Sequence, residues 1–596
     1  MRYGVFIILF ILVFSRYGTA QPVPYPQNYF RNPLGSPMEM AANFGELRPN
    51  HWHMGLDIRT QQRVNLQVNA AAGGYISHVG IRAQSFGRYI IIDHPNGYST
   101  LYAHLNDFYP ELEEYVTAQQ YKNETWAIEL DLPAGKFPVS KGQFIAYSGN
   151  TGGSQGPHLH FEIRDTKTGK CLNPLLFGFA VEDNVPPNLV KLAIYDRSRS
   201  IYSQSPLLLT LKNTDSGYII PKMPVISTGI RKISFGIQAY DRFTGSSNPN
   251  GIFSARLSLD DEPKNGFVID SLTYADSRYM NAHIDYRYRF HGGAFIQHLS
   301  RMPGDHGVAY SNLYGDGVIQ LADSNVHTVT IDVKDAHRNT SQLKFSIRYI
   351  DSLENFSPSF IHHPLIPEQV NVLEKPDFEM YLPEGCIYDT VPAMYYRNNS
   401  FPSSAVSALH QVNDESVPLH EDMTVRIKLN KPVSDDLKDK LLIRQTSRGS
   451  DIRKGTLQAG STNQEQWVMA KFDELGSYQV FTDLVPPEIN NLGKKDTIDL
   501  SPASRIVFQP KDNFGIIKKF RAGLNGKWLR FTNDKTRSYI YVFDERCPYG
   551  VHELKVTVED VVGNTTTRSW WFKRYPYTPK KKVVRKASKK ARKKKK

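Results

Sequence analysis

Gly156-Pro157-His158-Leu159-His160-Phe161 follows a glycine-rich turn, Ser148 to Gly153, in this chain of 596 residues. The glycines predict a tight turn, and the residues after Pro157 predict a β-strand. Side chains alternate between the two faces of a strand, so His158 and His160 should point the same way. Two imidazoles on one face can hold a metal ion, or hold a metal ion and move a proton.

A second element, His53-Met54-Gly55-Leu56-Asp57, stands about one hundred residues earlier. Histidine and carboxylate are ordinary zinc ligands, and three protein ligands leave a fourth position for water. The spacing of His53 and Asp57 would also suit an i, i+4 pair on a helix, but Gly55 and the following Ile58-Arg59-Thr60 favour a loop that leads into a strand.

A lone His-x-His pair is a weak signal, because such pairs occur by chance in many strands. The prediction of a zinc hydrolase therefore rests on a set of residues in one segment: His53, Asp57, His104, His158 and His160. We expect His53, Asp57 and His160 to bind one Zn²⁺ per chain. His104 and His158 would then hold, accept or return the proton of a zinc-activated water, for which an imidazole is suited.

Residues 45 to 174 resemble the lysostaphin/LytM-type zinc endopeptidases. The resemblance is carried by His53-Met-Gly-Leu-Asp57, by Gly97-Tyr-Ser-Thr-Leu-Tyr-Ala-His104, and by Gly149-Asn-Thr-Gly152 with Gly156-Pro-His-Leu-His-Phe-Glu162. It implies zinc binding by His53, Asp57 and His160, and catalytic assistance by His104 and His158. It also implies cleavage of the peptide cross-links of bacterial peptidoglycan, although the family includes inactive members that activate other wall hydrolases.

An acidic and aromatic segment, roughly residues 106–138, departs from the family pattern. A long insertion beside a site could be a lid or a specificity wall, or it could pack on the next domain as a surface elaboration. If it blocks the site, the protein is a non-catalytic envelope adaptor or activator of another cell-wall hydrolase. A secreted peptidase that acts on proteins would use the same zinc chemistry, and the motifs do not separate it from a wall hydrolase.

The first 20 residues have the pattern of a signal peptide. Arg2 is followed by ten apolar residues, Val5 to Phe14, and by the small residues Gly18-Thr19-Ala20. Ten apolar residues are too few for a membrane span, which needs about 20, and no later segment resembles one. We therefore expect an exported protein of the periplasm, the cell surface or the extracellular space. Three dispersed cysteines, Cys171, Cys386 and Cys547, argue against a disulfide framework and are too far apart for a cysteine-rich zinc site.

The formal net charge of +13 belongs to one end of the chain. Twelve lysines and arginines and no acid stand in residues 580–596, so the remainder is close to neutral. Such a run cannot bury a core and is predicted to be a disordered tail. In an exported protein we expect it to contact anionic envelope polymers, or to have no specific partner. No nucleic acid partner is expected.

The remainder of the chain predicts further β domains, because short strand patterns alternate with turn signals every eight to twelve residues. Val185-Pro-Pro187 recurs as Val485-Pro-Pro487, and Asp335-Ala-His-Arg-Asn339 recurs as Asp560-Val-Val-Gly-Asn564. Each pair should mark the beginning and the final hairpin of one sandwich. The fold class is therefore all-β, with a small antiparallel zinc peptidase domain followed by β-sandwich (Ig-like) domains. The predicted segments are a signal peptide (1–20), the peptidase domain (21–180), a β-sandwich (184–352), a β-rich module (353–483), an Ig-like β-sandwich (484–574) and a basic tail (575–596).

Overall fold

The structure is a computed structural model that describes residues 25–310, 314–353, 363–399, 402, 404–446, 449–460, 465–536 and 538–578. The predicted signal peptide and the basic run 580–596 lie outside these residues. Strands dominate the chain, and the predicted all-β class is confirmed. Within the described ranges, none of the helices has both the length and the apolar character that a membrane span requires.

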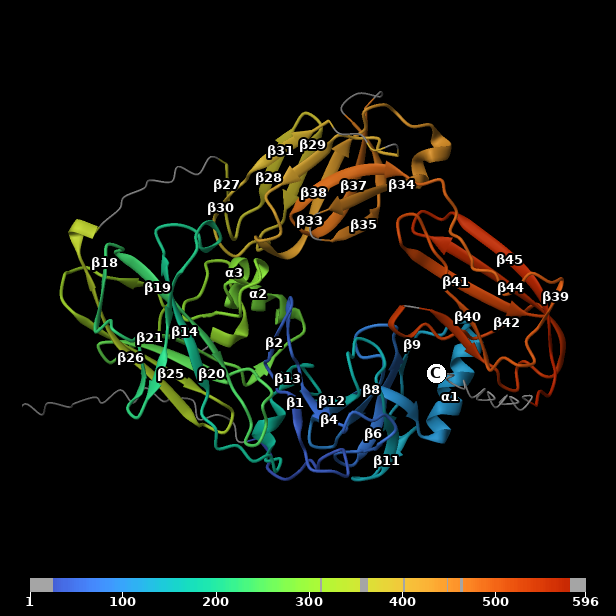
Figure 1. Cartoon of the computed structure of the whole chain (residues 1–596), viewed down its shortest axis with the longest axis horizontal. Coiled ribbons are helices and arrows are strands. Elements are labelled where there is room, and N and C mark those ends of the chain that lie inside the picture. The colour runs from blue at the N-terminus through green and yellow to red at the C-terminus, as the bar shows by residue number, and fades with distance from the viewer. Residues whose placement is uncertain are drawn as a thin grey trace, which may run out of the picture.

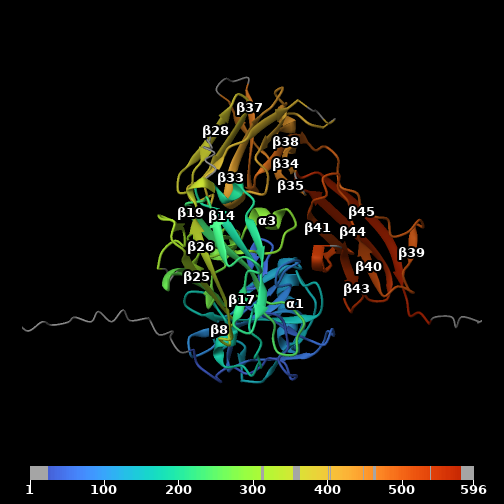
Figure 2. The same ribbon diagram turned by 60° about the vertical axis from the view of Figure 1, so that its left-hand side comes forward.

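Four β units follow one another around a ring in Figure 1, from blue through green and orange to red. They are the N-terminal domain (residues 25–177), the first sandwich (188–349), the second sandwich (364–482) and the third sandwich (488–574). The third sandwich returns beside the N-terminal domain, as both views show (Figures 1 and 2). The immunoglobulin-like character of the sandwiches stays a prediction.

The N-terminal domain is built on one antiparallel sheet around β12 (His158–Asp165). β4 (Leu56–Arg59) and β8 (Tyr98–Phe108) flank this strand, and their Asp57 and Ala103 stand directly opposite His160. The other strands of the sheet are β1 (Met40–Ala42), β5 (Gln67–Asn69), β6 (Gly74–Ile81), β7 (Arg88–Asp93), β9 (Ile128–Asp131), β10 (Pro138–Val139), β11 (Phe144–Ser148), β13 (Cys171–Leu172) and β22 (Ser271–Leu272). A separate hairpin pairs β2 (Leu47–Arg48) with β3 (His51–Trp52).

Helix α1 (Pro110–Asn123) occupies the first half of the predicted insertion. Proline in the first turn and the acidic residues Glu111 and Glu113 suit a helix N-terminus, where backbone N–H groups lack partners and the dipole is positive. The helix buries Leu112 and Val116. It therefore packs on its own domain with one side, and its other contacts go to the third sandwich.

The first sandwich packs two sheets face to face, and the rings of Phe235 and Phe345 meet between them at 5.5 Å. One sheet comprises β14 (Asn188–Asp196), β15 (Leu207–Thr210), β19 (Lys232–Tyr240), β23 (Gln297–His298) and β24 (Ile319–Gln320). The other comprises β16 (Lys212–Thr214), β17 (Gly217–Ile219), β18 (Val225–Thr228), β20 (Ser254–Leu259), β21 (Glu262–Val268), β25 (His327–Lys334) and β26 (Thr340–Tyr349). Helices α2 (Met280–His283) and α3 (Tyr286–Phe290) lie in the connection between β22 and β23.

The first sandwich is joined to the N-terminal domain by backbone pairing. β13 pairs with β22, so the large sheet continues into the connection between the strands of the sandwich. Asn43 exchanges two hydrogen bonds with the backbone of Gly251, at 2.8 and 2.9 Å. Buried apolar residues of both units form one continuous core. The two units should therefore move as one body.

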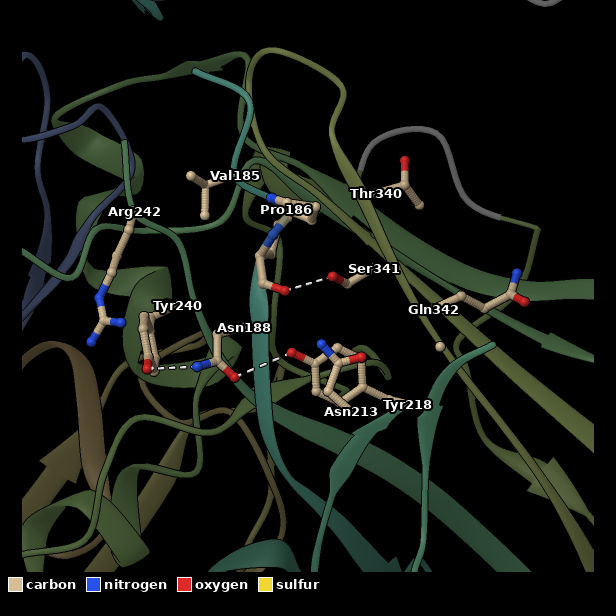
Figure 3. A pocket seen from close by; sticks show the side chains of 12 residues that line it. Val185, Pro186, Asn188, Asn213, Tyr218, Tyr240, Arg242, Thr340, Ser341 and Gln342 are labelled. Carbon is tan, nitrogen blue, oxygen red and sulfur yellow. Dashed lines mark hydrogen bonds between the residues drawn. The ribbon is translucent and has the colours of Figure 1, made fainter. Parts of the chain in front are cut away.

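The chain enters the first sandwich along Val185-Pro186-Pro187, and this segment is held on both sides (Figure 3). Ser341 Oγ donates a hydrogen bond to Pro187 O at 2.6 Å. Asn188 donates to Tyr240 Oη at 2.7 Å and accepts from Tyr218 Oη at 3.3 Å. Proline cannot pair through its nitrogen, so these side chains supply hydrogen bonds that a regular strand would obtain from the backbone.

The second and third sandwiches each pair two further sheets. The second comprises β28 (Asn371–Lys375), β29 (Phe378–Leu382), β33 (Pro418–Lys428), β37 (Gln466–Glu474) and β36 (Thr456–Ala459), against β31 (Tyr395–Asn398), β32 (Leu409–Val412), β38 (Gly476–Thr482), β34 (Leu441–Thr446) and β35 (Ser450–Lys454), with β27 (Pro364–Leu365) and β30 (Val391–Pro392) beside them. The third comprises β39 (Thr497–Asp499), β45 (Thr565–Arg574), β44 (Gly550–Asp560), β41 (Ile517–Leu524) and β42 (Lys527–Trp528), against β40 (Arg505–Phe508) and β43 (Tyr539–Val542).

Candidate metal centre

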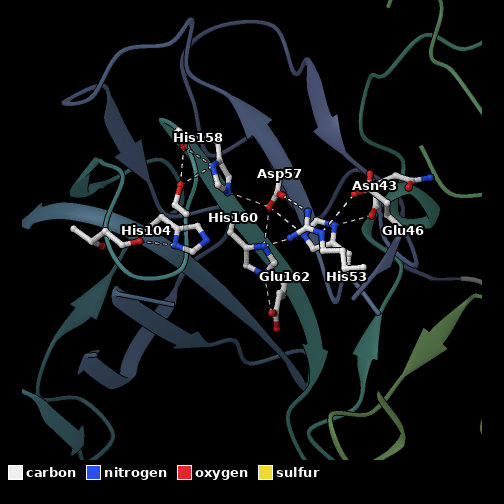
Figure 4. Close-up of polar contacts among 12 residues, drawn as sticks. Asn43, Glu46, His53, Asp57, His104, His158, His160 and Glu162 are labelled. Carbon is white, nitrogen blue, oxygen red and sulfur yellow. Dashed lines mark hydrogen bonds and ion pairs between the residues drawn. The ribbon is translucent and has the colours of Figure 1, made fainter. Parts of the chain in front are cut away.

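Three side chains from two neighbouring strands and the turn before β4 converge on one point (Figure 4). His53 Nε2 lies 3.0 Å from both Asp57 Oδ1 and His160 Nδ1, and His160 Nδ1 lies 2.9 Å from Asp57 Oδ1. All three residues are buried. The ligand atoms of a tetrahedral zinc ion are about 3.3 Å apart, so this spacing is close to that of a zinc site.

The remaining nitrogen of each imidazole is already engaged. His53 Nδ1 lies 2.7 Å from the carbonyl oxygen of Asn43, which can only accept, so this nitrogen carries the proton. His160 Nε2 lies 2.8 Å from Glu162 Oε1 and donates to it. The inner nitrogens are then both bare acceptors, and they face a carboxylate oxygen that is also an acceptor. Three buried acceptors at hydrogen-bond distance need a proton or a metal ion between them.

The charge states of His53 and Asp57 suit zinc, which requires neutral imidazole and ionised carboxylate. Burial lowers the pKa of His53 to about 4. Burial opposes ionisation of Asp57, but the adjacent histidines hold its pKa well below the usual range. For His160, hydrogen bonds to Asp57 and Glu162 outweigh burial and raise the pKa to about 9. A metal ion at this point would take the place of that proton.

Arg48 closes the outer side of the candidate centre. Its guanidinium donates to Asp57 Oδ2 at 2.5 Å and lies 3.5 Å from Glu46 Oε1. The sequence left open whether Arg48 pairs with Glu46 or meets a substrate carboxylate, and here it bridges two carboxylates of its own chain. Asp57 therefore offers Oδ1 to the centre while Arg48 orients the carboxylate through the other oxygen.

His104 and His158 lie beside the three candidate ligands, and both are oriented by backbone carbonyls. His104 Nδ1 donates to Thr151 O at 2.9 Å, and His158 Nδ1 donates to Gly156 O at 2.8 Å. Their rings are 4.7 Å apart. His158 Nε2 lies 3.4 Å from Asp57 Oδ1. Since each Nδ1 carries a proton, each Nε2 is left as a base, which is the form that proton transfer needs.

The backbone of His104 is strained. Its φ of 59° lies in the left-handed region, which residues other than glycine rarely adopt. His104 N donates to Phe86 O at 2.9 Å, outside the β8 ladder. Strained conformations persist where the surroundings determine them, and they cluster at functional sites. The conformation here turns the imidazole toward His158 and His160.

Two residues without an assigned role in the sequence analysis support His160. Glu162 follows it by two on β12, so the alternation that pairs His158 with His160 could have identified this carboxylate too. Tyr274, from the connection that leads to the helices of the first sandwich, donates its hydroxyl to Glu162 Oε1 at 2.5 Å. It stands 112 positions away along the chain, so no local pattern could reveal it.

Glu162 is fully buried, and Arg164 contacts it at 2.6 Å. Burial opposes its ionisation, but Arg164, His160 and Tyr274 together lower its pKa to about 2. A carboxylate that fixes a ligand imidazole typically contributes about 10–100-fold to metal affinity. We expect Glu162→Gln to weaken zinc binding by that factor, measured by competition with a chromophoric chelator. Glu129→Gln, a change at a carboxylate outside the centre, should leave the affinity unchanged, and equal affinities for all three proteins would contradict a supporting role.

A short loop of the third sandwich, Asp534 to Thr536, rests on the glycine-rich turn beside these histidines. Asp534 Oδ1 accepts from Gly152 N at 2.8 Å, and Lys535 N donates to Ala83 O at 2.7 Å. Lys535 Nζ donates to Ser154 O and lies 3.3 Å from Asn150 Oδ1. Thr151, in this turn, supplies the carbonyl that orients His104, and Gly156, three residues after the turn, supplies the carbonyl that orients His158. The loop therefore contacts the segment that supports both rings.

The predicted insertion does not make this contact, because its helix lies against a different part of the third sandwich. The rings of Tyr121 and Trp528 meet at 5.1 Å. Arg530 donates to Gln120 Oε1 at 2.6 Å, and Arg521 pairs with Glu124. Of the two interpretations left open by the sequence, these contacts favour packing on another domain, which is the last one in the chain.

Two segments of the chain match known protein families. Residues 51–121 and 132–174 match Peptidase family M23, and residues 362–483 match the Zu5-like domain. The resemblance predicted from the motifs is confirmed. The first match is interrupted at residues 122–131, within the predicted insertion.

Individual relatives align with the same region. The chain is 31% identical over 170 residues to an uncharacterized metalloprotease of Haemophilus influenzae, covering 27% of this chain and 30% of that protein. It is 34% identical over 123 residues to the DD-carboxypeptidase/endopeptidase Mpg of Neisseria meningitidis, covering 21% and 22%. The catalytic domain of lysostaphin from Staphylococcus simulans is 22% identical, with 24% and 91% covered and a TM-score of 0.18. The chain thus spans less than a third of the curated relatives it matches.

Proposed function

Because residues 51–174 form a peptidase family M23 domain, we propose that this protein is an exported zinc metalloendopeptidase that hydrolyses peptide cross-links of bacterial peptidoglycan. M23 peptidases are zinc enzymes. The observation that carries the proposal is the set of three converging acceptors, His53 Nε2, Asp57 Oδ1 and His160 Nδ1, each within about 3 Å of the other two. Without a metal ion, the burial of three acceptors at this spacing would be unfavourable.

Zinc held by these three residues would polarise the scissile carbonyl and lower the pKa of a water to about 7. The remaining roles fall to the chain itself. His104 and His158 present Nε2 toward the same space, and each can accept the proton of the attacking water and return it to the departing amine. Asn43 O and Glu162 hold the two ligand imidazoles in the required tautomer.

The proposed substrate class, peptidoglycan, is supported by the names of the relatives and not by side chains around the candidate centre. One relative is named as a DD-carboxypeptidase/endopeptidase and another, 26% identical over 132 residues, as the cell division protein DipM of Caulobacter vibrioides. Export would bring the enzyme to such a substrate, and the apolar run near residue 10 supports it. The bond that is cut would be chosen by the walls around the centre.

The test is mass spectrometry of purified peptidoglycan after incubation with the zinc-loaded chain. New fragments with free cross-link termini are expected, and their masses identify the bond. A protein substrate such as a glycine-rich polypeptide should be cut much more slowly. Cleavage of the protein and not of peptidoglycan would replace this proposal by a secreted peptidase of proteins. Bound zinc without any cleavage would favour the non-catalytic adaptor.

The loop Asp534 to Thr536 lies beside the candidate centre, and we expect it to restrict the access of substrate. Since Lys535 fastens this loop to the glycine-rich turn, we expect Lys535→Ala to raise the rate of peptidoglycan cleavage about threefold to tenfold. A typical hydrogen bond contributes about 0.5–1.5 kcal/mol net, and 1.4 kcal/mol is a factor of ten. The measurement is the initial rate of fragment release.

The matched control is Lys519→Ala, because this lysine pairs with Glu559 inside the third sandwich. Its rate should equal that of the unchanged protein. A fall in rate for Lys535→Ala would mean that the loop supports the histidines instead of restricting access. Equal rates for both variants would remove the loop from the account of regulation.

A further inference from the structure

Two clusters of three aspartates occupy equivalent positions in the first and third sandwiches. One comprises Asp183, Asp241 and Asp335, and the other comprises Asp483, Asp512 and Asp560. In each cluster the three residues offer carboxylate oxygens that lie within 4.8 Å of one another. The first member precedes Val-Pro-Pro, and the third stands in the final hairpin of the sandwich, where Asp335 directly follows β25 and Asp560 is the last residue of β44. These are the segments whose sequences repeat along the chain.

The hydrogen bonds around the clusters repeat as well. Asn339 Nδ2 donates to Asp335 Oδ2 at 2.7 Å and to Asp183 O at 3.1 Å. Asn564 Nδ2 donates to Asp560 Oδ2 at 2.7 Å and to Asp483 O at 3.0 Å. In both sandwiches an asparagine therefore clamps the final hairpin to the segment that enters the sandwich. Such a clamp fixes the two outer carboxylates of the cluster relative to each other.

In the first cluster, buried oxygens lack donors. Asp183 is 6% exposed and Asp241 is 2% exposed. Among the described residues, Asp183 Oδ2 and Asp241 Oδ1 have no hydrogen-bond partner. His337 Nδ1 lies 3.7 Å from Asp183 Oδ2, which is too far for a hydrogen bond. Native structures rarely leave buried carboxylate oxygens unsatisfied, so each of these needs an explanation such as a bound ion.

The second cluster shows the same deficit. Asp483 and Asp560 are completely buried. Within the part of the chain that the structure describes, Asp483 Oδ2 and Asp512 Oδ1 have no hydrogen-bond partner. The other oxygen of Asp483 accepts from Val485 N at 3.1 Å and from Asn513 Nδ2 at 3.0 Å. In Asp483 and Asp512, one carboxylate oxygen is thus used for orientation while the other is left open.

Carboxylates at this separation repel one another, and burial adds to the cost of their charge. Burial and the neighbouring aspartates raise the pKa of Asp241 to about 8. The same causes raise the pKa values of Asp183 and Asp512, and burial raises the pKa of Asp335. Both sandwiches thus contain a cluster of carboxylates that is unfavourable without a bound cation. A divalent cation at each cluster would explain this, because it supplies the positive charge that offsets the repulsion.

We propose that each of these two clusters binds a calcium ion. Carboxylate oxygens without nitrogen or sulfur ligands select a hard cation. Calcium takes six to eight oxygen ligands in a flexible geometry, and backbone carbonyls and waters can complete its shell. Magnesium requires near-ideal octahedral geometry and usually keeps several waters, and structural zinc sites are built from cysteine and histidine. The sites stand independently of the proposed peptidase activity.

The consequence of binding lies at the junctions between units. Asp183 follows the N-terminal domain and Asp483 follows β38 (Gly476–Thr482) of the second sandwich. Each ion would fasten the incoming chain to two other segments of the sandwich that it enters. Calcium would therefore stiffen the junction before the first sandwich and the junction before the third.

The test is calorimetric titration of the full chain with CaCl₂ after treatment with EGTA. Two ions per chain are expected, with dissociation constants at or below about 1 mM, the upper limit for extracellular calcium modules. Asp241→Asn and Asp512→Asn should each bind one ion and the double variant none. His160→Ala should still bind two, which separates these sites from the candidate zinc centre. No binding by the unchanged protein, or the same stoichiometry in all variants, would overturn the proposal.

Thermal unfolding gives a second readout that does not depend on the affinity of the variants. Calcium at 100 times its dissociation constant should raise the midpoint of the unchanged protein by about 5–15 °C. Without calcium, Asp512→Asn should unfold at the same temperature as the unchanged protein or higher, because it removes a buried charge. With calcium the order should reverse. The absence of this reversal would indicate that the clusters are structural and bind no ion.

Discussion

Replacing His160 with alanine is expected to abolish both zinc retention and cleavage of peptidoglycan. His160 Nδ1 stands within 3.0 Å of both His53 Nε2 and Asp57 Oδ1, so its loss opens one side of the centre. A zinc ion supplies several kcal/mol of transition-state stabilisation, and each 1.36 kcal/mol is a factor of ten. We expect kcat/KM to fall at least about 1000-fold. Zinc content by mass spectrometry and fragment release from peptidoglycan are the two measurements.

The control for this change is His291→Ala, because His291 is an exposed histidine outside the centre. It should keep one zinc ion and full activity. Circular dichroism of His160→Ala should match the unchanged protein, since β12 keeps its backbone pairs with β4 and β8. Retention of zinc and activity by His160→Ala would remove His160 from the ligand set and, with it, the proposed mechanism.

Replacing His158 with alanine should separate chemistry from metal binding. The side chain is oriented by Gly156 O and directs Nε2 toward the centre, so we assign it to proton transfer. General acid–base groups contribute about 10²–10⁴-fold. We expect kcat to fall by that factor while zinc content stays at one ion per chain.

His104→Ala should have an effect of the same kind, since its ring lies 4.7 Å from His158 and is oriented in the same way. If the two residues act as a unit, the double variant should be little slower than the slower single variant. Loss of zinc from His158→Ala would instead make His158 a metal ligand. This outcome is a real alternative, because His158 Nε2 lies only 3.4 Å from Asp57 Oδ1.

The parts of the site that the sequence could predict depend on local periodicity and on short motifs. The alternation of a strand predicts that His158 and His160 share a face, and β12 runs through both. The all-β class followed from strand patterns and turns. The Asn96-Gly97 turn between β7 and β8 has the left-handed glycine, φ 84°, that such hairpins use.

The rest depends on contacts between residues far apart in the chain. Tyr274 reaches Glu162 only because β13 pairs with β22, and Lys535 reaches Ser154 across 381 positions. The repeated motifs identify two aspartates of each calcium cluster. Asp241 and Asp512 share only the short pattern Asp-x-Phe (Asp241-Arg-Phe243 and Asp512-Asn-Phe514), and they join the others only in the folded sandwich. Sequence reasoning predicts the candidate zinc ligands of this chain, whereas the distant neighbours that contact and orient them appear only in three dimensions.

The return of the third sandwich to the N-terminal domain makes their contact an intramolecular one. Partners joined by a tether meet at an effective concentration that can reach about the millimolar range. An interface that would dissociate between separate molecules can therefore remain closed within this chain, and dilution does not open it. A competitor that binds no more tightly than the loop must be present at a comparable local density to displace the loop from the glycine-rich turn. A dense polymer network satisfies that condition, whereas an isolated soluble fragment of the same polymer does not.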